Sequence, residues 1–217
     1  MLRKICLIIF LVTVAFSNFV AAADKPKVAV MDLGEFSGAY ATEVNTANVG
    51  AMVVDYILEA LTEDGRFMVI DRELYEKQLN EKNLQKAGLI SPSRAREIAK
   101  ILGVDYLIYG NFSSLTGKDG ILEVLKYGSG GRLYEIKAKI TIRIGHVQND
   151  KKEMPVIAMA KGVGISKSSQ VKVGTNTISI TVGTAKIPQE SVHNAAQKAA
   201  YDAVAKLLKN LPENFFN

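Results

Sequence analysis

The segment Ile98–Phe112, with the sequence IAKILGVDYLIYGNF, constrains the fold more than any other part of the chain. Its first half has the apolar spacing of a helix and ends at Gly103, and glycine commonly ends helices because it tolerates the left-handed backbone conformation. Residues 104–109 then form an almost continuous apolar run, which is typical of a strand covered on both faces. The segment therefore predicts the central strand of an α/β domain, entered directly from a helix.

The N-terminus has the pattern of a secretory signal peptide. Two basic residues, Arg3 and Lys4, precede an apolar run over residues 6–14, and Ala21–Ala23 offers a small-residue cleavage site. The run is shorter than the roughly 20 residues of a spanning helix, so a retained amphipathic anchor is the less favoured alternative. We expect residues 1–23 to be removed and the remainder to be exported.

The composition of the mature chain excludes several function classes. Removal of the signal peptide takes away two basic residues and no acidic one, so the formal net charge falls from +5 to +3, which is too small to indicate nucleic-acid binding. The only cysteine, Cys6, lies in the signal peptide. We therefore expect no disulfide, no thiol nucleophile and no lipid attached at a mature N-terminal cysteine. Residues 24–217 suit one domain.

The first half of the mature chain alternates predicted strands and helices. We expect strands at residues 27–33 and 66–71, and a helix from Val49 that ends at Gly65. A further helix is expected from Asp71 to about Lys82, and another after Ser91-Pro92, where serine caps the helix and proline takes its first position. This order predicts an α/β (α+β) fold with a mixed sheet flanked by helices.

The second half is predicted to consist of strands followed by an Ala-rich helix. Residues 133–147 alternate apolar and polar side chains, over a length well beyond the usual five or six residues of a strand. Residues 154–164 are expected to return antiparallel. The helix after Pro188 has a stripe of small residues that permits close docking on a sheet, and we favour packing of the apolar face of 133–147 beneath it over contact with lipid.

Two β-hairpin extensions are predicted, at residues 112–134 and 160–186. In the second, weak alternation places Val163, Ile165, Val171 and Val173 on one face. The chain turns at residues 174–177, and the returning strand carries Ile178, Ile180 and Val182. A membrane strand needs about 9–11 residues with an unbroken apolar face, and Lys167 and Ser169 interrupt that of the first strand. A membrane hairpin and a surface or subunit-contact hairpin therefore both remain open.

Several segments together resemble the CsgG family of curli production assembly proteins and, more distantly, the TolB N-terminal-like periplasmic domains. The matching segments are VAVMDL at residues 28–33, GRFMVIDR at 65–72, the loop at 84–90, and AKILGVDYLIYG at 99–110. The long strand and the C-terminal helix follow in the family's order. The resemblance covers most of residues 27–210.

The resemblance implies a periplasmic domain that forms a ring homo-oligomer at the outer membrane. In the family's channel members each subunit donates two β-hairpins to a shared pore, through which extended protein substrates diffuse. The loop after the first strand narrows that pore, which makes Tyr40, Glu43 and Asn45 the pore-constriction candidates. Those members also carry an acylated N-terminal cysteine, whereas this chain is expected not to be lipidated.

The alternative hypothesis is that the same domain is a soluble periplasmic accessory protein, which scaffolds an envelope machine or activates a cell-wall enzyme. Under this hypothesis the partners are envelope proteins rather than a secreted substrate.

The sequence lacks the motifs that are typical of metal-dependent and nucleophilic catalysis. His146 and His193 lack cysteine partners and HExxH spacing, so solvated polar histidines are the simpler interpretation. Ser169 and Lys172 fit an SxxK pattern, but positions three apart on a strand face opposite sides. We therefore expect no catalytic residue, no cofactor and no metal.

Overall fold

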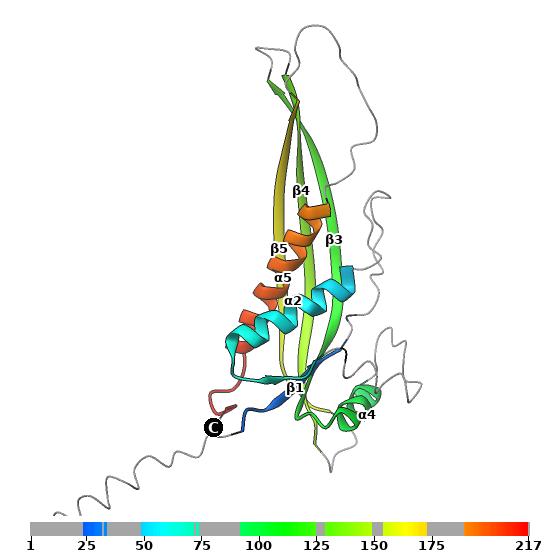
Figure 1. Ribbon diagram of the computed structural model, residues 1–217, viewed down its shortest axis with the longest axis vertical. Helices are drawn as coiled ribbons and strands as arrows, with labels where there is room; N and C mark the ends of the chain where they lie inside the picture. Colours follow the sequence, from blue (N-terminus) through cyan, green and yellow to red (C-terminus); the bar gives the residue numbers. More distant parts are fainter. Residues whose placement is uncertain are drawn as a thin grey trace, which may run out of the picture.

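The computed structural model describes residues 24–31, 33, 49–71, 73, 92–124, 129–148, 154–172 and 189–216. Their elements, in chain order, are β1 (Lys27–Val30), α2 (Val49–Asp64), β2 (Met68–Val69), α4 (Pro92–Leu102), β3 (Tyr106–Val124), β4 (Ser129–His146), β5 (Val156–Lys172) and α5 (Gln189–Lys209). The strands form one sheet in the order β2-β1-β3-β4-β5 (Figure 1). β1 is parallel to both of its neighbours and the remaining pairs are antiparallel, so the predicted mixed α+β fold is confirmed.

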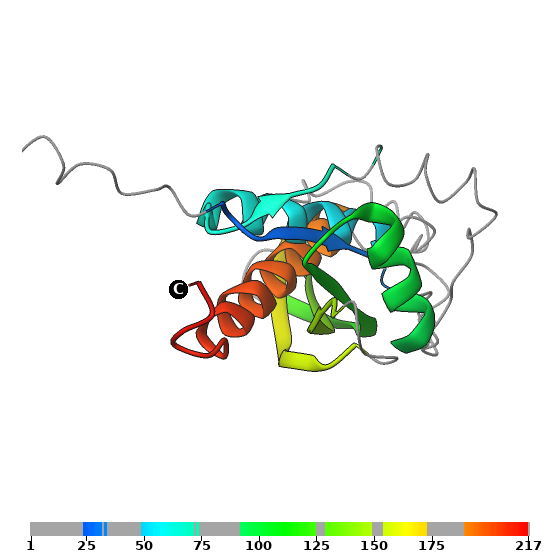
Figure 2. The ribbon, with the colours of Figure 1, turned by 90° about the horizontal axis from the view of Figure 1, so that it is seen from below.

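β3 holds the middle position of the sheet, and its first residues are covered on both faces, as the sequence predicts. Ile108 lies in a first core beneath α2 and α5, and Leu107 lies in a second core beneath α4 (Figure 2). Both side chains are fully buried. Neighbouring strand residues point to opposite faces, so the continuous apolar run places one side chain in each core.

Two glycines end the helices that lead into strands. Gly65 follows α2 with φ 73°, and Gly103 follows α4 with φ 62°. The Gly65 N–H donates to the Leu61 carbonyl at 3.2 Å. A side chain would strain this left-handed conformation, so both predicted helix ends are confirmed together with their physical reason. The helix expected from Asp71 to Lys82 lies outside the described residues, apart from Asp71 and Glu73.

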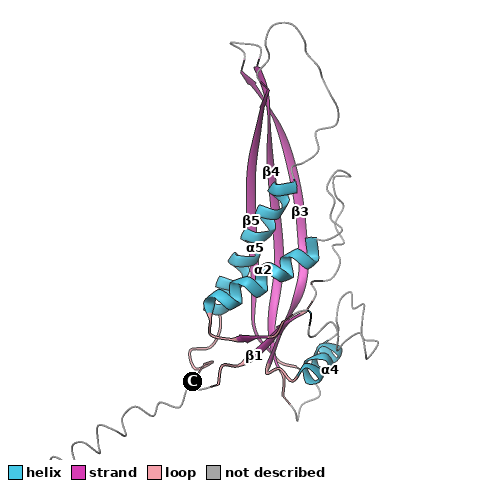
Figure 3. Ribbon diagram, viewed as in Figure 1, coloured by secondary structure: helices cyan, strands magenta, loops and turns pink. Residues whose placement is uncertain are grey.

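β3, β4 and β5 are 19, 18 and 17 residues long, and they project past the helices as one twisted ribbon (Figure 3). The pairing runs from Tyr106↔His146 to Val124↔Ser129, and β4 pairs with β5 as far as Gly130↔Lys172. The strands predicted at 133–147 and 154–164 are therefore both present and longer than expected. Residues 129–134 pair on one side with β3 and on the other with the end of β5.

α5 packs closely on β4 and β5. The buried face of β4 is the predicted apolar one: Ile136, Ala138, Ile140, Ile142 and Ile144. In β5, Gly162 and Gly164 touch the helix backbone, so a Cβ on Gly162 would meet the carbonyl oxygen of Ala199, and a Cβ on Gly164 that of Ala195. Small residues on both elements thus allow this approach, which confirms the docking predicted from the Ala-rich stripe.

The chain after α5 folds back on the lower end of the first core. The ring centroids of Phe216 and Phe67 are 5.2 Å apart, and those of Phe215 and Tyr106 are 4.6 Å apart. The guanidinium carbon of Arg66 lies 4.9 Å from the centroid of the Phe216 ring, within the range of a cation–π contact. These aromatic contacts hold the C-terminal segment against the sheet.

We expect Gly164→Ala to lower the free energy of unfolding by about 1–3 kcal/mol, because the added methyl group overlaps the Ala195 carbonyl and forces α5 away from the sheet. Urea unfolding followed by circular dichroism measures the change. Val163→Ala is the matched control, since the neighbouring side chain is 39% exposed and its loss should change stability by about 0.5 kcal/mol or less. Equal effects from both variants would show that the close approach does not limit stability.

Candidate interaction surfaces

The structure describes two of the predicted site residues in full. Val163 and Ile165 lie in β5 on the face opposite Gly162 and Gly164, and each is 39% exposed. Val171 lies in β5 with only its backbone described. The other predicted site residues lie outside the described part of the chain: Tyr40, Glu43, Asn45, Val173, Ile178, Ile180 and Val182.

Val163 and Ile165 belong to a mixed basic and apolar surface, which we call the open face. It consists of Lys137, Lys139 and Arg143 of β4 with Met159, Lys161, Val163, Ile165 and Lys167 of β5. The register sets Lys139 opposite Val163 and Lys137 opposite Ile165. Among the side chains described on β4 and β5 here, Glu135 is the one acid, and its carboxylate lies 3.3 Å from the Lys167 ammonium. The open face therefore carries net positive charge around exposed apolar side chains.

The outer edge of β5 is closed by α5 through four hydrogen bonds, which we call the edge ladder. Asn210 Nδ2 donates to the Met159 carbonyl at 3.1 Å, Lys206 Nζ to the Lys161 carbonyl at 3.3 Å, the Val163 N–H to Asp202 Oδ2 at 2.9 Å, and Lys198 Nζ to the Ile165 carbonyl at 3.3 Å. The helix residues are four apart and the strand residues two apart. Sequence reasoning missed the ladder, although its signal is a polar i,i+4 stripe beside the alanines.

The spacing of the ladder follows from the two backbone geometries. Four helix residues rise about 6 Å, and two strand residues about 6.6 Å, so helix and strand stay in step over four contacts. An edge strand with unpaired backbone groups pairs readily with other strands. The ladder therefore closes the edge of β5 from Met159 to Ile165. It ends near the start of α5, where Ser191 Oγ donates to Ser168 Oγ at 2.9 Å, and β5 continues to Lys172 (Figure 3).

Asp202 is the charged centre of the edge ladder. Partial burial raises the pKa of its carboxyl group, but hydrogen bonds from Lys206 and from the Val163 N–H outweigh that effect and leave the pKa below its ordinary value. Lys206 Nζ lies 2.6 Å from Asp202 Oδ2. The ionised carboxylate is thus the form that the folded ladder favours.

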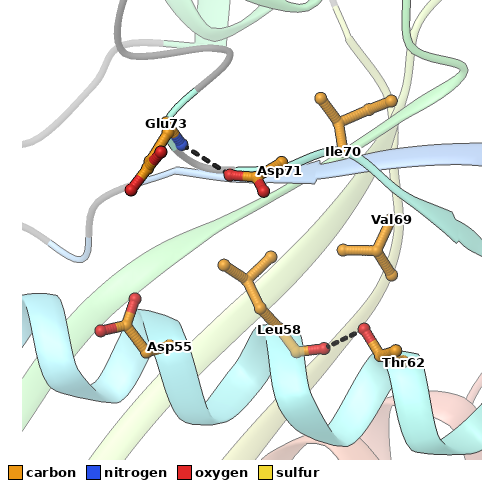
Figure 4. Close-up of a pocket in the computed structure, with 7 residues that line it drawn as sticks. All are labelled: Asp55, Leu58, Thr62, Val69, Ile70, Asp71 and Glu73. Carbon is orange, nitrogen blue, oxygen red and sulfur yellow. Dashed lines mark hydrogen bonds between the residues drawn. The ribbon is translucent and has the colours of Figure 1, made fainter.

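A second surface lies at the opposite edge of the sheet, and we call it the acidic groove. Its walls are Asp55, Leu58 and Thr62 from α2, and Val69, Ile70, Asp71 and Glu73 from β2 and the residues after it (Figure 4). The groove is open and has a volume of about 750 Å³, which is the size of several side chains. Asp71 Oδ1 accepts a hydrogen bond from the Glu73 N–H at 2.8 Å, which is the contact that a side chain makes when it caps the start of a helix.

α2 extends the negative surface beyond the groove. The helix contains four acidic residues and no basic one: Asp55, Glu59, Glu63 and Asp64. Glu59 and Glu63 lie beside the Tyr201 hydroxyl of α5, and desolvation together with these two carboxylates raises the pKa of Tyr201 to about 12. Asp64 is paired with Arg66, with the two nearest atoms 2.7 Å apart.

The described residues hold no group of three His, Cys, Asp or Glu side chains that could bind a metal ion. Of the two histidines, His146 stacks on Tyr106 with ring centroids 4.9 Å apart, and His193 is exposed on α5. None of the helices in the described ranges is long and apolar enough to cross a membrane.

Comparison with known proteins gives one family match and several distant structural similarities. The family model of the curli production assembly/transport component CsgG matches residues 14–215. No curated protein matches the chain.

Three of the similar solved structures share 13–14% sequence identity with the chain. The LpoB C-terminal domain from Salmonella enterica has a TM-score of 0.42 and 14% identity, over 69% of this chain and 90% of that one. Lipoprotein GNA1162 from Neisseria meningitidis has a TM-score of 0.40 and 13% identity, over 70% and 88%. The PelC dodecamer from Paraburkholderia phytofirmans has a TM-score of 0.39 and 14% identity, over 88% and 91%.

We expect Asp202→Asn to destabilise the protein at neutral pH and to have a shrinking effect as the pH falls. The folded-state pKa of Asp202 lies below the unfolded-state value, so the stabilisation is fully present above the unfolded pKa of about 4 and is lost as the pH falls through the folded pKa. Urea unfolding of both proteins between neutral and strongly acidic pH measures the difference. A difference that does not depend on pH would rule out the ionised carboxylate as the cause.

We also expect the double variant Glu59→Gln, Glu63→Gln to lower the pKa of Tyr201 from about 12 toward its ordinary value near 10, because two negative charges beside the hydroxyl are removed. An ultraviolet difference titration against Tyr201→Phe isolates this phenol from the other tyrosines. Glu190→Gln, at the far end of α5, is the control and should leave the titration unchanged.

Proposed function

The chain belongs to the CsgG family of curli production assembly/transport components, and we propose that it is a subunit of a ring-shaped secretion channel in the cell envelope. In this proposal identical subunits surround a pore through which extended protein substrates diffuse. The observation that carries the proposal is the three-stranded ribbon β3-β4-β5, which projects past the helices and whose outer edge is closed by α5 only over part of its length.

The partly closed edge supports assembly because an exposed strand edge needs cover. The ladder shields β5 up to Ile165, whereas the strand itself runs on to Lys172. Neighbouring subunits supply the cover for the rest of the ribbon. In this proposal Val171 and the predicted hairpin residues beyond it contact either the neighbouring subunit or the membrane.

The rest of the proposal follows the family. The loop after β1 narrows the pore, with Tyr40, Glu43 and Asn45 nearest the constriction. The protein is exported to the periplasm by its signal peptide, associates with the outer membrane without lipidation, and works without catalysis or a cofactor.

The second candidate function is a soluble periplasmic accessory or scaffold protein, and the open face favours it. Lys137, Lys139 and Lys161 share that face with Val163 and Ile165, and the Glu135–Lys167 ion pair crosses it. Charged side chains at this density suit contact with water or with an anionic protein surface better than contact with lipid.

Fractionation of cells that express the full chain distinguishes the two functions. The channel predicts that the protein stays with the envelope, resists a high-salt wash, and after detergent extraction migrates in size-exclusion chromatography as a ring-sized particle. A soluble periplasmic protein of known mass serves as the control for complete release by osmotic shock. A small species released with that control would contradict the channel and support the accessory function.

A further inference from the structure

The large apolar side chains that are exposed in the described residues occur on two strands only. Met68 lies in β2, and Val156, Met159, Val163 and Ile165 lie in β5, each between 39% and 49% exposed. β2 and β5 are the two opposite edges of the sheet. The four exposed apolar side chains on β5 gather on one strand and mark a contact surface, whereas Met68 is a single exposed side chain.

The open face and the acidic groove carry charges of opposite sign. On β5 the apolar side chains are interleaved with the lysines and the arginine of the open face. The acidic groove is lined by the carboxylates of Asp55, Asp71 and Glu73 together with the apolar side chains of Leu58, Val69 and Ile70 (Figure 4). Each surface therefore combines apolar side chains with charges of one sign, and that sign is opposite to the sign on the other surface.

We infer that the open face of one copy docks on the acidic groove of the next copy around the ring, an inference that rests on the proposed function. A two-fold contact that pairs either surface with its own copy would place lysine against lysine or carboxylate against carboxylate, and like charges in contact are unfavourable. A head-to-tail contact pairs the opposite charges, and repetition of such a contact closes into a ring. The apolar groups supply buried area, and the charges select the partner face.

Charge reversal on each surface tests this contact. The open-face variant is Lys139→Glu with Lys161→Glu, two neighbours on adjacent strands. The groove variant is Asp55→Lys with Glu73→Lys, which keeps the Asp71 cap intact. Each double variant should raise the subunit concentration for half-assembly by about tenfold or more, and the four substitutions together should restore it to within about threefold of the wild type. Analytical ultracentrifugation in detergent measures these concentrations.

Two controls separate lost contacts from lost folding. Lys209→Glu reverses an exposed lysine in the last turn of α5 that belongs to neither surface, and it should assemble like the wild type. Thermal unfolding by circular dichroism must match the wild type for each variant. If the variant with Asp55→Lys does not fold, the single variants Glu73→Lys and Lys139→Glu, and their combination, test the same contact with one reversed charge on each surface.

The outcomes distinguish the inference from the proposed function. A wild-type protein that forms no ring overturns the proposed function and the inference with it. A wild-type ring that both reversed variants also form overturns the inference alone. Folded variants that lose assembly singly and are not rescued by the combination show that these two faces do not meet, which also overturns the inference. Restored assembly in the combined variant supports the inference, because reversing both sets of charges restores attraction only where the two surfaces contact each other directly.

Discussion

The close approach of α5 to β5 is the contact on which the rest of the structure depends. Gly162 and Gly164 leave no side chain between the strand and the helix, and the alanines of α5 meet them with equally small groups. At this short separation the helix both covers the isoleucine face of β4 and brings its polar stripe within hydrogen-bond distance of the β5 edge. Larger residues would separate the two elements and open the core and the edge together.

This contact gives the ribbon two different regions. Up to Ile165 the edge is closed by the ladder, and the contact of the strand with α5 ends at Ser168. Beyond it the three strands remain paired with one another, because the register continues to Val124↔Ser129 and Gly130↔Lys172. The helix thus determines where the self-sufficient domain ends and where the ribbon that serves other contacts begins. In the proposed ring, this boundary separates the part that folds alone from the part that neighbours complete.

The features predicted from sequence are those whose cause is local. Gly65 and Gly103 end helices through their own backbone conformation, and Leu107 and Ile108 are buried because a strand alternates faces. The edge ladder could not be predicted, since it depends on the register of Val163 against Asp202, 39 residues away. The acidic groove likewise joins α2 to the segment after β2. The extra length of β3 lacks an alternating pattern because Gly117 and Gly120 interrupt it.

The separation of charge between the two edges is a consequence of the same packing. In β4 every second residue is buried under α5, so the lysines between them must face outward on the open face. In α2 the apolar stripe faces the sheet and the helix contains no basic residue, so its outer surface is negative. The modest net charge of the mature chain therefore conceals two strong local charges of opposite sign. Because both signs reside on one chain, a second copy offers each surface its complement, and a head-to-tail arrangement of copies pairs each surface with the opposite charge.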